Sequence, residues 1–116
     1  MSRDIGILNA TARPPTEDLG EFPEVTRRTA GYELRKLQRG ELPDDWRPFP
    51  EVGSGVNEIR IDSPDGLLRV MYVAKFAEAI YVLHSFQKTT RKTVRNDVEI
   101  AKTRYRAVVA ERKALK

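Results

Sequence analysis

The residues best suited to chemistry lie in one stretch near the end of the chain, directly after an apolar segment. His84 is the only histidine in the sequence, and an imidazole can accept or donate a proton near neutral pH. The segment that follows, residues 87–93 with the sequence QKTTRKT, holds three cations and no acid. Cations at this density repel one another unless a polyanion neutralises them. The stretch therefore indicates acid–base chemistry or binding at a phosphate-rich ligand.

The charge of the chain is divided unevenly along its length. Residues 84–116 contain ten Lys/Arg and three Asp/Glu, a net charge of +7. Residues 1–83 contain eleven Lys/Arg and fourteen Asp/Glu, a net charge of −3, and the whole chain carries +4. A cationic third beside a mildly acidic two-thirds predicts a polyanion site at one end of the molecule.

Each of these features also has a plain structural explanation. A solvated surface loop would account for the cations, and a hydrogen-bonded, half-buried residue at the end of a strand would account for His84 about as well as catalysis does. The functional interpretation gains from Arg60 and Arg69, which lie on the two preceding strand patterns. If the strands pair in order, Arg60, Arg69 and His84 can converge on one face beside the basic loop.

Several classes of function are disfavoured by composition. The chain has no cysteine and one histidine, so thiol chemistry is excluded and we expect no metal site and no cofactor. It contains no P-loop, dinucleotide-binding or zincin motif. No apolar run reaches membrane-spanning length, and the start of the chain does not resemble a secretory signal, so we expect a cytoplasmic protein without membrane contact. Cation-assisted chemistry on an RNA phosphodiester, in which a 2′-hydroxyl attacks its own phosphate, is the enzymatic option that remains.

The elements that must position these residues follow an α+β pattern in one domain, residues 1–116, of which 1–18 are weakly patterned apart from a short edge strand at 5–8. A helix is predicted from Pro23 to Arg39, ended by Gly40. A Pro- and Gly-rich connector, 41–55, follows, with Trp46 and Phe49 packed under it. Three short strands, at 56–61, 67–73 and 79–85, predict an antiparallel meander. A helix capped by Thr93 then runs toward the C-terminus.

Both predicted helices have two distinct faces. The first presents Val25 and Tyr32 on one side and Ala30, Leu34 and Leu37 on the other. One of these sides should pack on the sheet, and the other is covered either by residues 1–22 or by a partner. The C-terminal helix has an apolar stripe and, about a quarter turn away, a basic stripe. The apolar stripe is Val94, Val98, Ala101, Tyr105, Val108 and Arg112, and the basic stripe is Arg95, Lys102, Arg106 and Lys113.

The sequence resembles the phage-derived Gp49-like group of the RelE/ParE toxin superfamily, also called HigB-like toxins, over roughly residues 19–113. The strongest similarity is in RVMYVAKFAEAIYVLHSFQKTTRKT at 69–93, in EIAKTRYR at 99–106 and in FPEVTRRTAGYELRKLQRGELPDDWRPFP at 22–50. The resemblance implies a RelE-like α+β fold, with N-terminal helical elements packed on a small curved antiparallel sheet and a C-terminal helix after the last strand. It also implies the toxin of a type II toxin–antitoxin module, a metal-free, ribosome-dependent mRNA endoribonuclease.

Site residues are carried over from the resemblance by position. Arg69 stands where such enzymes place a phosphate-stabilising arginine, and Arg60 stands on the preceding strand, where a basic residue is common. His84 and Lys88 complete the expected catalytic set. The expected RNA-binding residues are Gln87, Arg91, Lys92, Arg95, Lys102 and Arg106. The implied partners are mRNA, the ribosome and a cognate helix-turn-helix antitoxin.

The basic loop departs from the pattern of the group, F-Q-K-K-T-Q-K-T-P. Thr89 replaces the second lysine, Arg91 replaces glutamine and Val94 replaces proline. The loop keeps the number of cations found in the group, but it lacks the proline at the start of the following helix. An inactive homologue is therefore one alternative. The others are a binding protein of the same fold, directed at a protein target or at nucleic acid without cleavage, and a phage accessory protein with a structural role.

Overall fold

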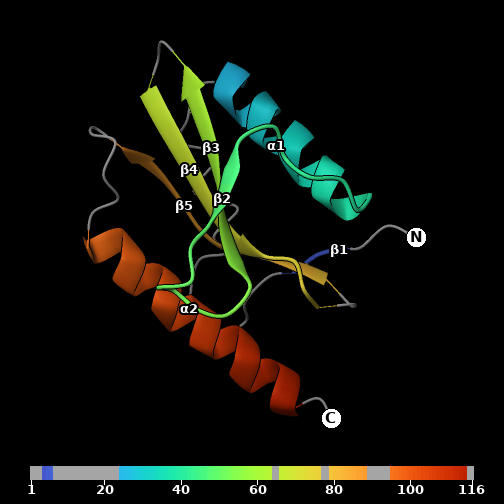
Figure 1. Ribbon diagram of the computed structural model, residues 1–116, viewed down its shortest axis with the longest axis vertical. Coiled ribbons are helices and arrows are strands. Elements are labelled where there is room, and N and C mark those ends of the chain that lie inside the picture. The colour runs from blue at the N-terminus through green and yellow to red at the C-terminus, as the bar shows by residue number, and fades with distance from the viewer. Residues whose placement is uncertain (1–3, 7–23, 64–65, 77–78, 89–94, 115–116) are drawn as a thin grey trace.

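The computed structural model describes residues 4–6, 24–63, 66–76, 79–88 and 95–114. Within them, two helices and five strands form an α+β fold, which confirms the predicted fold class (Figure 1). In chain order the elements are β1 (Asp4–Gly6), α1 (Glu24–Gln38), β2 (Trp46–Pro48), β3 (Val56–Ser63), β4 (Gly66–Val73), β5 (Ala79–Lys88) and α2 (Arg95–Ala114).

The strands form one sheet in the order β1-β5-β4-β3-β2. Strands β2 to β5 pair antiparallel, as short connections between them require, and β1 adds a parallel edge beside β5. The pairing of β4 with β5 shifts register between Met71 and Tyr72, because Met71 pairs with His84 and Tyr72 with Val82. The extra residue on β5 is Leu83, which forms a β-bulge that bends the sheet and increases its twist.

Helix α1 covers one face of the sheet. Its Ala30, Leu34 and Leu37 pack with Ile59 and Val70 in a buried cluster, as their spacing on a helix predicts. The helix ends in a hydrogen-bonded turn at Gly40, which has a φ of +82°. The Gly40 amide donates to the Leu37 carbonyl and the Glu41 amide to that of Lys36. Glycine is favoured here because a Cβ disfavours this left-handed conformation.

Helix α2 covers the opposite face (Figure 1). Val98, Ala101 and Val108 are buried against Met71 and Leu83, and Tyr105 packs at the edge of the same cluster. The burial of Val98, Ala101 and Val108 confirms this part of the predicted apolar stripe. Tyr105 is half-buried, and Val94 lies outside the described residues. The sheet therefore has an apolar core on each face, and β3, β4 and β5 contribute side chains to both cores.

Two short strands differ from the sequence expectation. We expected an edge strand at 5–8, and β1 instead spans Asp4–Gly6. The segment Trp46–Pro48 was expected to be a connector, yet it pairs with β3 as the edge strand β2. Proline is tolerated there because it has no N–H to donate, and an edge strand forms backbone hydrogen bonds with a neighbouring strand on one side only. Trp46 and Phe49 are half-buried, and Phe49 packs against the core under α2 as predicted. No helix in the described ranges is long and apolar enough to cross a membrane.

Candidate functional site

Arg60, Arg69 and His84 lie on the same face of the sheet, the face that packs against α2. Arg60 pairs directly with Arg69, Arg69 pairs with Phe86, and His84 pairs with Met71. Directly paired residues project to the same side of a sheet, as do residues two apart on a regular strand. The expectation that these three residues share one face is therefore confirmed.

Arg69 is the most buried cation of this group, with 4% of its side chain exposed. Its Nη1 donates to Asp62 Oδ1 at 2.7 Å and to the Leu68 carbonyl at 2.9 Å. Its Nε lies 4.0 Å from Glu58 Oε1 and makes no hydrogen bond with a described residue. The two hydrogen bonds of Nη1 therefore hold the Arg69 side chain in place, while its buried Nε–H lacks an acceptor among the described residues, which is costly.

Carboxylates accompany the other arginines on this face. Arg47 Nε donates to Glu58 Oε1 at 3.0 Å, and the Glu58 side chain is fully buried. Arg60 donates from Nε and Nη2 to Asp45 Oδ1, at 3.2 and 3.1 Å. The site is thus a mixed network of charges rather than a simple cationic patch. An incoming phosphate must compete with these carboxylates for the guanidinium groups.

His84 connects the last strand to α2. Its Nε2 lies 2.9 Å from Asp97 Oδ1, and its Nδ1 lies 3.3 Å from Arg104 Nη1. Because a guanidinium can only donate, Nδ1 is the acceptor, and the tautomer assigned from this network carries its proton on Nε2 and donates it to Asp97. The ring stacks on Phe86 with centroids 4.9 Å apart. His84 is buried, with 7% exposed, and it lies inside β5 rather than at the strand end that the sequence suggested. Its hydrogen bonds are those expected of a structural residue.

The bulge at Leu83 determines on which face His84 lies. Tyr81 pairs with Val73 on the α2 side, and Val82 lies on the α1 side. Strict alternation would put Leu83 on the α2 side and His84 on the α1 side. The extra residue in β5 keeps both on the α2 side, where Leu83 is buried in the core and His84 contacts two side chains of the helix.

The remaining expected site residues are distributed differently. Gln87 is exposed and pairs with Leu68, whose side chain packs on the α1 side, so its register places it on the face opposite Arg69 and His84. Alternation along β5 is the reason, and the expectation that Gln87 binds RNA stays a prediction. Lys88 pairs with Leu67 through its backbone. The Lys88 side chain, Arg91 and Lys92 lie outside what the structure describes.

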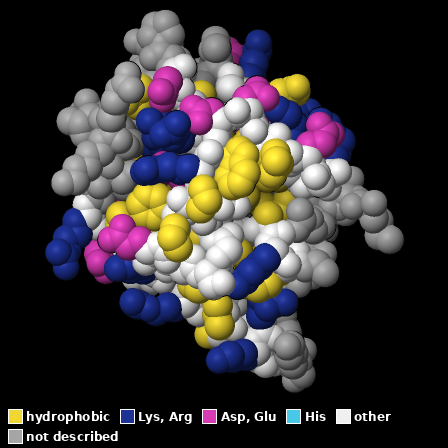
Figure 2. Space-filling model, viewed as in Figure 1, with side chains coloured by type: hydrophobic (Ala, Val, Ile, Leu, Met, Phe, Trp, Pro, Cys, Tyr) yellow, Lys and Arg dark blue, Asp and Glu magenta, His cyan; other side chains and the backbone are white. Residues whose placement is uncertain are grey.

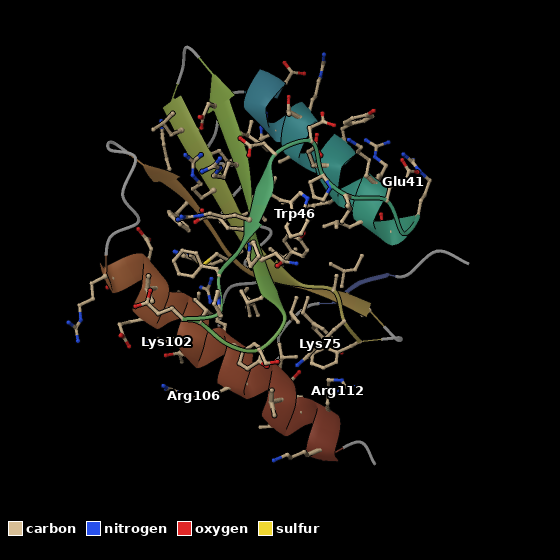
Figure 3. The ribbon with its side chains drawn as sticks, in the orientation of Figure 1. Glu41, Trp46, Lys75, Lys102, Arg106 and Arg112 are labelled. Carbon is tan, nitrogen blue, oxygen red and sulfur yellow. The ribbon has the colours of Figure 1, made fainter. Side chains whose placement is uncertain are left out.

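The basic stripe of α2 is on the surface. Arg95, Arg106 and Lys113 are exposed and Lys102 is half-exposed, with its Nζ 3.6 Å from Glu99 Oε1. Lys and Arg side chains follow the length of this helix (Figure 2), and Arg106 points away from the sheet (Figure 3). The stripe is separate from the arginines of the sheet, which belong to the mixed network of charges described above.

Six residues of the site were missed from the sequence: Asp45, Arg47, Glu58, Asp62, Asp97 and Arg104. Glu58 alternates with Arg60 on the same strand, and this signal was available. Asp97 and Arg104 are seven residues apart, two helical turns, and so share a helix face. Nothing local to either residue indicates that this face meets His84, because the contact depends on the bulge. No group of three or more His, Asp or Glu side chains that could hold a metal ion occurs among the described residues.

Comparison with known families gives one match. The family described as "phage derived protein Gp49-like (DUF891)" matches residues 17–106. That range includes α1, the strands β2 to β5 and the first half of α2. It covers the charged residues of the sheet face and all of the basic stripe except Lys113. No curated protein matches the chain.

Proposed function

Because the chain belongs to the family of phage-derived Gp49-like proteins, we propose that it is the toxin of a type II toxin–antitoxin module and cleaves mRNA on the ribosome. The observation that carries this proposal is the placement of Arg69 and His84 on one sheet face, on adjacent strands. A buried, fixed guanidinium beside a group that can titrate suits chemistry on a phosphodiester better than chemistry on an uncharged substrate.

The proposed reaction uses the RNA itself as nucleophile. The 2′-hydroxyl attacks the adjacent phosphorus, its proton passes to a base, and the leaving 5′-oxygen receives a proton from an acid. In this scheme Arg69 and Arg60 stabilise the charge that develops on the phosphate, and Lys88 supplies a further cation. His84 transfers a proton only after it releases Asp97 or Arg104, because both ring nitrogens are engaged.

The exposed cations of α2 have a separate role in this proposal. Arg95, Lys102 and Arg106, with Arg91 and Lys92 before them, would contact phosphates of rRNA or mRNA and fix the orientation of the toxin without reading bases. A helix-turn-helix antitoxin would neutralise the protein in the cytoplasm.

A second candidate is a binding protein of the same fold that does not cleave RNA. The engaged nitrogens of His84 favour it, and so do the carboxylates that accompany Arg47, Arg60 and Arg69. In this case the charged face is a recognition surface in which every group is already held in place.

Primer extension on an mRNA, incubated with the protein in the presence and absence of translating ribosomes, separates the two candidates. The proposal predicts new 5′ ends only when ribosomes are present. Co-sedimentation with ribosomes is measured in parallel. Co-sedimentation without new 5′ ends would support the binding protein, and the absence of both would contradict the ribosomal proposal.

A further inference from the structure

A second surface feature lies on the outer side of α2, away from the charged face. Tyr105, Arg106, Val109, Ala110 and Lys113 line a shallow hollow of about 310 Å³, which we call the α2 hollow. Its apolar residues are only partly used by the fold. Val109 is half-exposed and Ala110 exposed, whereas Val98, Ala101 and Val108 are the buried residues of the helix.

One wall of the α2 hollow is held firmly. The Tyr105 hydroxyl donates to the Ser54 carbonyl at 2.9 Å. A Cβ at Gly53 would lie 2.5 Å from Cε2 of the ring, so only glycine allows the backbone to approach the ring this closely. A wall fixed in this way loses little side-chain freedom when a ligand binds, which favours affinity.

Two cations flank the apolar floor. Arg106 and Lys113 are exposed, and neither forms an ion pair with any described residue. They are seven residues apart, about 10.5 Å along a helix axis at 1.5 Å per residue. In Figure 2, hydrophobic side chains lie between Lys/Arg side chains over the C-terminal half of α2. A complementary ligand therefore has a row of apolar groups, flanked by negative charges at the spacing of Arg106 and Lys113.

We propose that the α2 hollow is a docking surface for an acidic amphipathic helix of a protein partner. A helix packed alongside α2 repeats its side chains at the same spacing, so two carboxylates two turns apart reach Arg106 and Lys113 while aliphatic side chains between them cover Val109 and Ala110. Single-stranded nucleic acid fits less well. Aliphatic side chains offer no aromatic surface for base stacking, and Gly53 lies against the Tyr105 ring.

This inference does not depend on the proposed cleavage of RNA. It has a consequence for that proposal, however, because Arg106 cannot contact a phosphate and a partner's carboxylate at the same time. A partner in the α2 hollow would therefore remove one of the RNA-binding cations and leave the charged sheet face open.

The test uses the full chain and a fluorescent designed peptide of about five helical turns, with leucines along one face and flanking glutamates. Binding is measured by anisotropy, and methyl NMR locates the site. The double substitution Arg106→Glu with Lys113→Glu should weaken binding at least about tenfold, and a peptide with lysines in place of the glutamates should restore it. The matched control is Arg27→Glu with Arg35→Glu, two exposed cations on α1, which should leave the affinity within about twofold.

The signals of Val109 and Ala110 should shift when the peptide is added. Equal affinity losses in the two double variants, or equal binding of a peptide with the same composition in scrambled order, would overturn the proposal. Methyl shifts confined to residues outside the α2 hollow would overturn it as well. If a uridine oligonucleotide shifts Val109 and the acidic peptide does not, the hollow binds nucleic acid and the proposal is wrong.

Discussion

Leu83 and His84 are neighbours in the chain, yet both lie on the α2 face of the sheet. The β-bulge in β5 causes this arrangement. Leu83 is buried in the core beneath α2, and His84 contacts Asp97 in the first turn of that helix. A single irregularity in one strand thus places the only histidine beside Arg69 rather than on the opposite face with Gln87.

Alanine at His84 should lower stability. The substitution removes a buried ring and leaves Asp97 and Arg104 without this partner, and we expect a loss of about 2 kcal/mol in the free energy of unfolding. His84→Gln keeps an N–H near the position of Nε2 and should lose less than half as much. Urea unfolding measures both variants. Equal losses would show that the contact to Asp97 contributes nothing to stability.

If His84 transfers a proton in the reaction, its replacement should slow cleavage about 10²–10⁴-fold. The buried contacts of His84 make alanine a poor probe of catalysis. His84→Gln is the better variant, because it cannot titrate and yet retains a donor toward Asp97. The predicted loss of cleavage applies to that variant.

Removing the carboxylate of Asp62 should strengthen RNA binding. Asp62 is half-exposed and occupies Nη1 of Arg69, so Asp62→Asn frees the guanidinium for a phosphate. We expect affinity for single-stranded RNA to rise about two- to fivefold, because an exposed ion pair contributes up to about 1 kcal/mol. Glu41→Gln is the matched control. It removes the same charge from an exposed pair with Arg39, and an equal gain there would show that net charge alone is responsible.

The basic stripe of α2 should determine much of the salt dependence of binding. Replacing Arg95, Lys102 and Arg106 with glutamine should reduce the slope of log affinity against log salt concentration by about 2, since each contact to a single-strand phosphate contributes about 0.7. Titrations of RNA at several salt concentrations measure the slope. The control replaces Arg27, Arg28 and Arg35 on α1. An unchanged slope in the α2 variant would make the stripe an ordinary solvated helix face.

Tyr72 should make the fold sensitive to alkaline pH. Burial raises the pKa of its hydroxyl above the ordinary value of 10.0, although a hydrogen bond with Asn57 acts in the opposite direction. Folding therefore favours the protonated hydroxyl of Tyr72. Its contribution to stability is complete below the pKa of an unfolded tyrosine, and it is lost as the pH rises through the higher pKa of Tyr72 in the folded protein. Tyr72→Phe should therefore unfold less readily above about pH 10 than the wild type. Tyr32→Phe, at a residue that is 54% exposed, should keep the wild-type profile. If the wild type and both variants lose stability in parallel as the pH rises, Tyr72 is not the cause of the alkaline sensitivity.

The fold could be predicted from local signals to a large extent. Gly40 ends α1 where the sequence indicates, and the three central strands and both helices lie close to their predicted ranges. The strand Trp46–Pro48 was missed because its prolines and polar neighbours resemble a loop, and only pairing with β3 makes it a strand. The Thr93 cap lies outside the described residues. The exposed ring of Tyr32 leaves open the prediction that this side of α1 binds a partner.

The site was predicted less completely, for a physical reason. Residue types indicate which side chains are able to act, but strand register decides which of them meet. Arg60, Arg69 and His84 were found because each has a distinctive chemistry. The carboxylates that accompany them come from three parts of the chain: Asp45 precedes β2, Glu58 and Asp62 lie on β3, and Asp97 lies in α2. No local pattern connects Asp45 or Asp97 with the strand residues, and the bulge that brings Asp97 to His84 is not visible in the run of apolar residues before His84.

The arginine that carries the central claim should be tested by a conservative change. Arg69→Ala should cripple turnover if Arg69 stabilises the phosphate. It also removes one of two arginines beside the buried Glu58 and should cost about 3 kcal/mol of stability. Arg69→Lys keeps the charge and loses the fork of donors. Its melting temperature should fall less than that of the alanine variant. A similar fall would mean that the guanidinium geometry is structural.

The most direct measurement is the single-turnover rate of mRNA cleavage on programmed ribosomes, for the wild type and for Arg69→Lys at matched folded concentration. The account predicts that the wild type cleaves at the ribosome and that Arg69→Lys, still bound to ribosomes, cleaves at least about 10²-fold more slowly. Equal rates in the two proteins, or no cleavage by the wild type on ribosomes to which it binds, would contradict it.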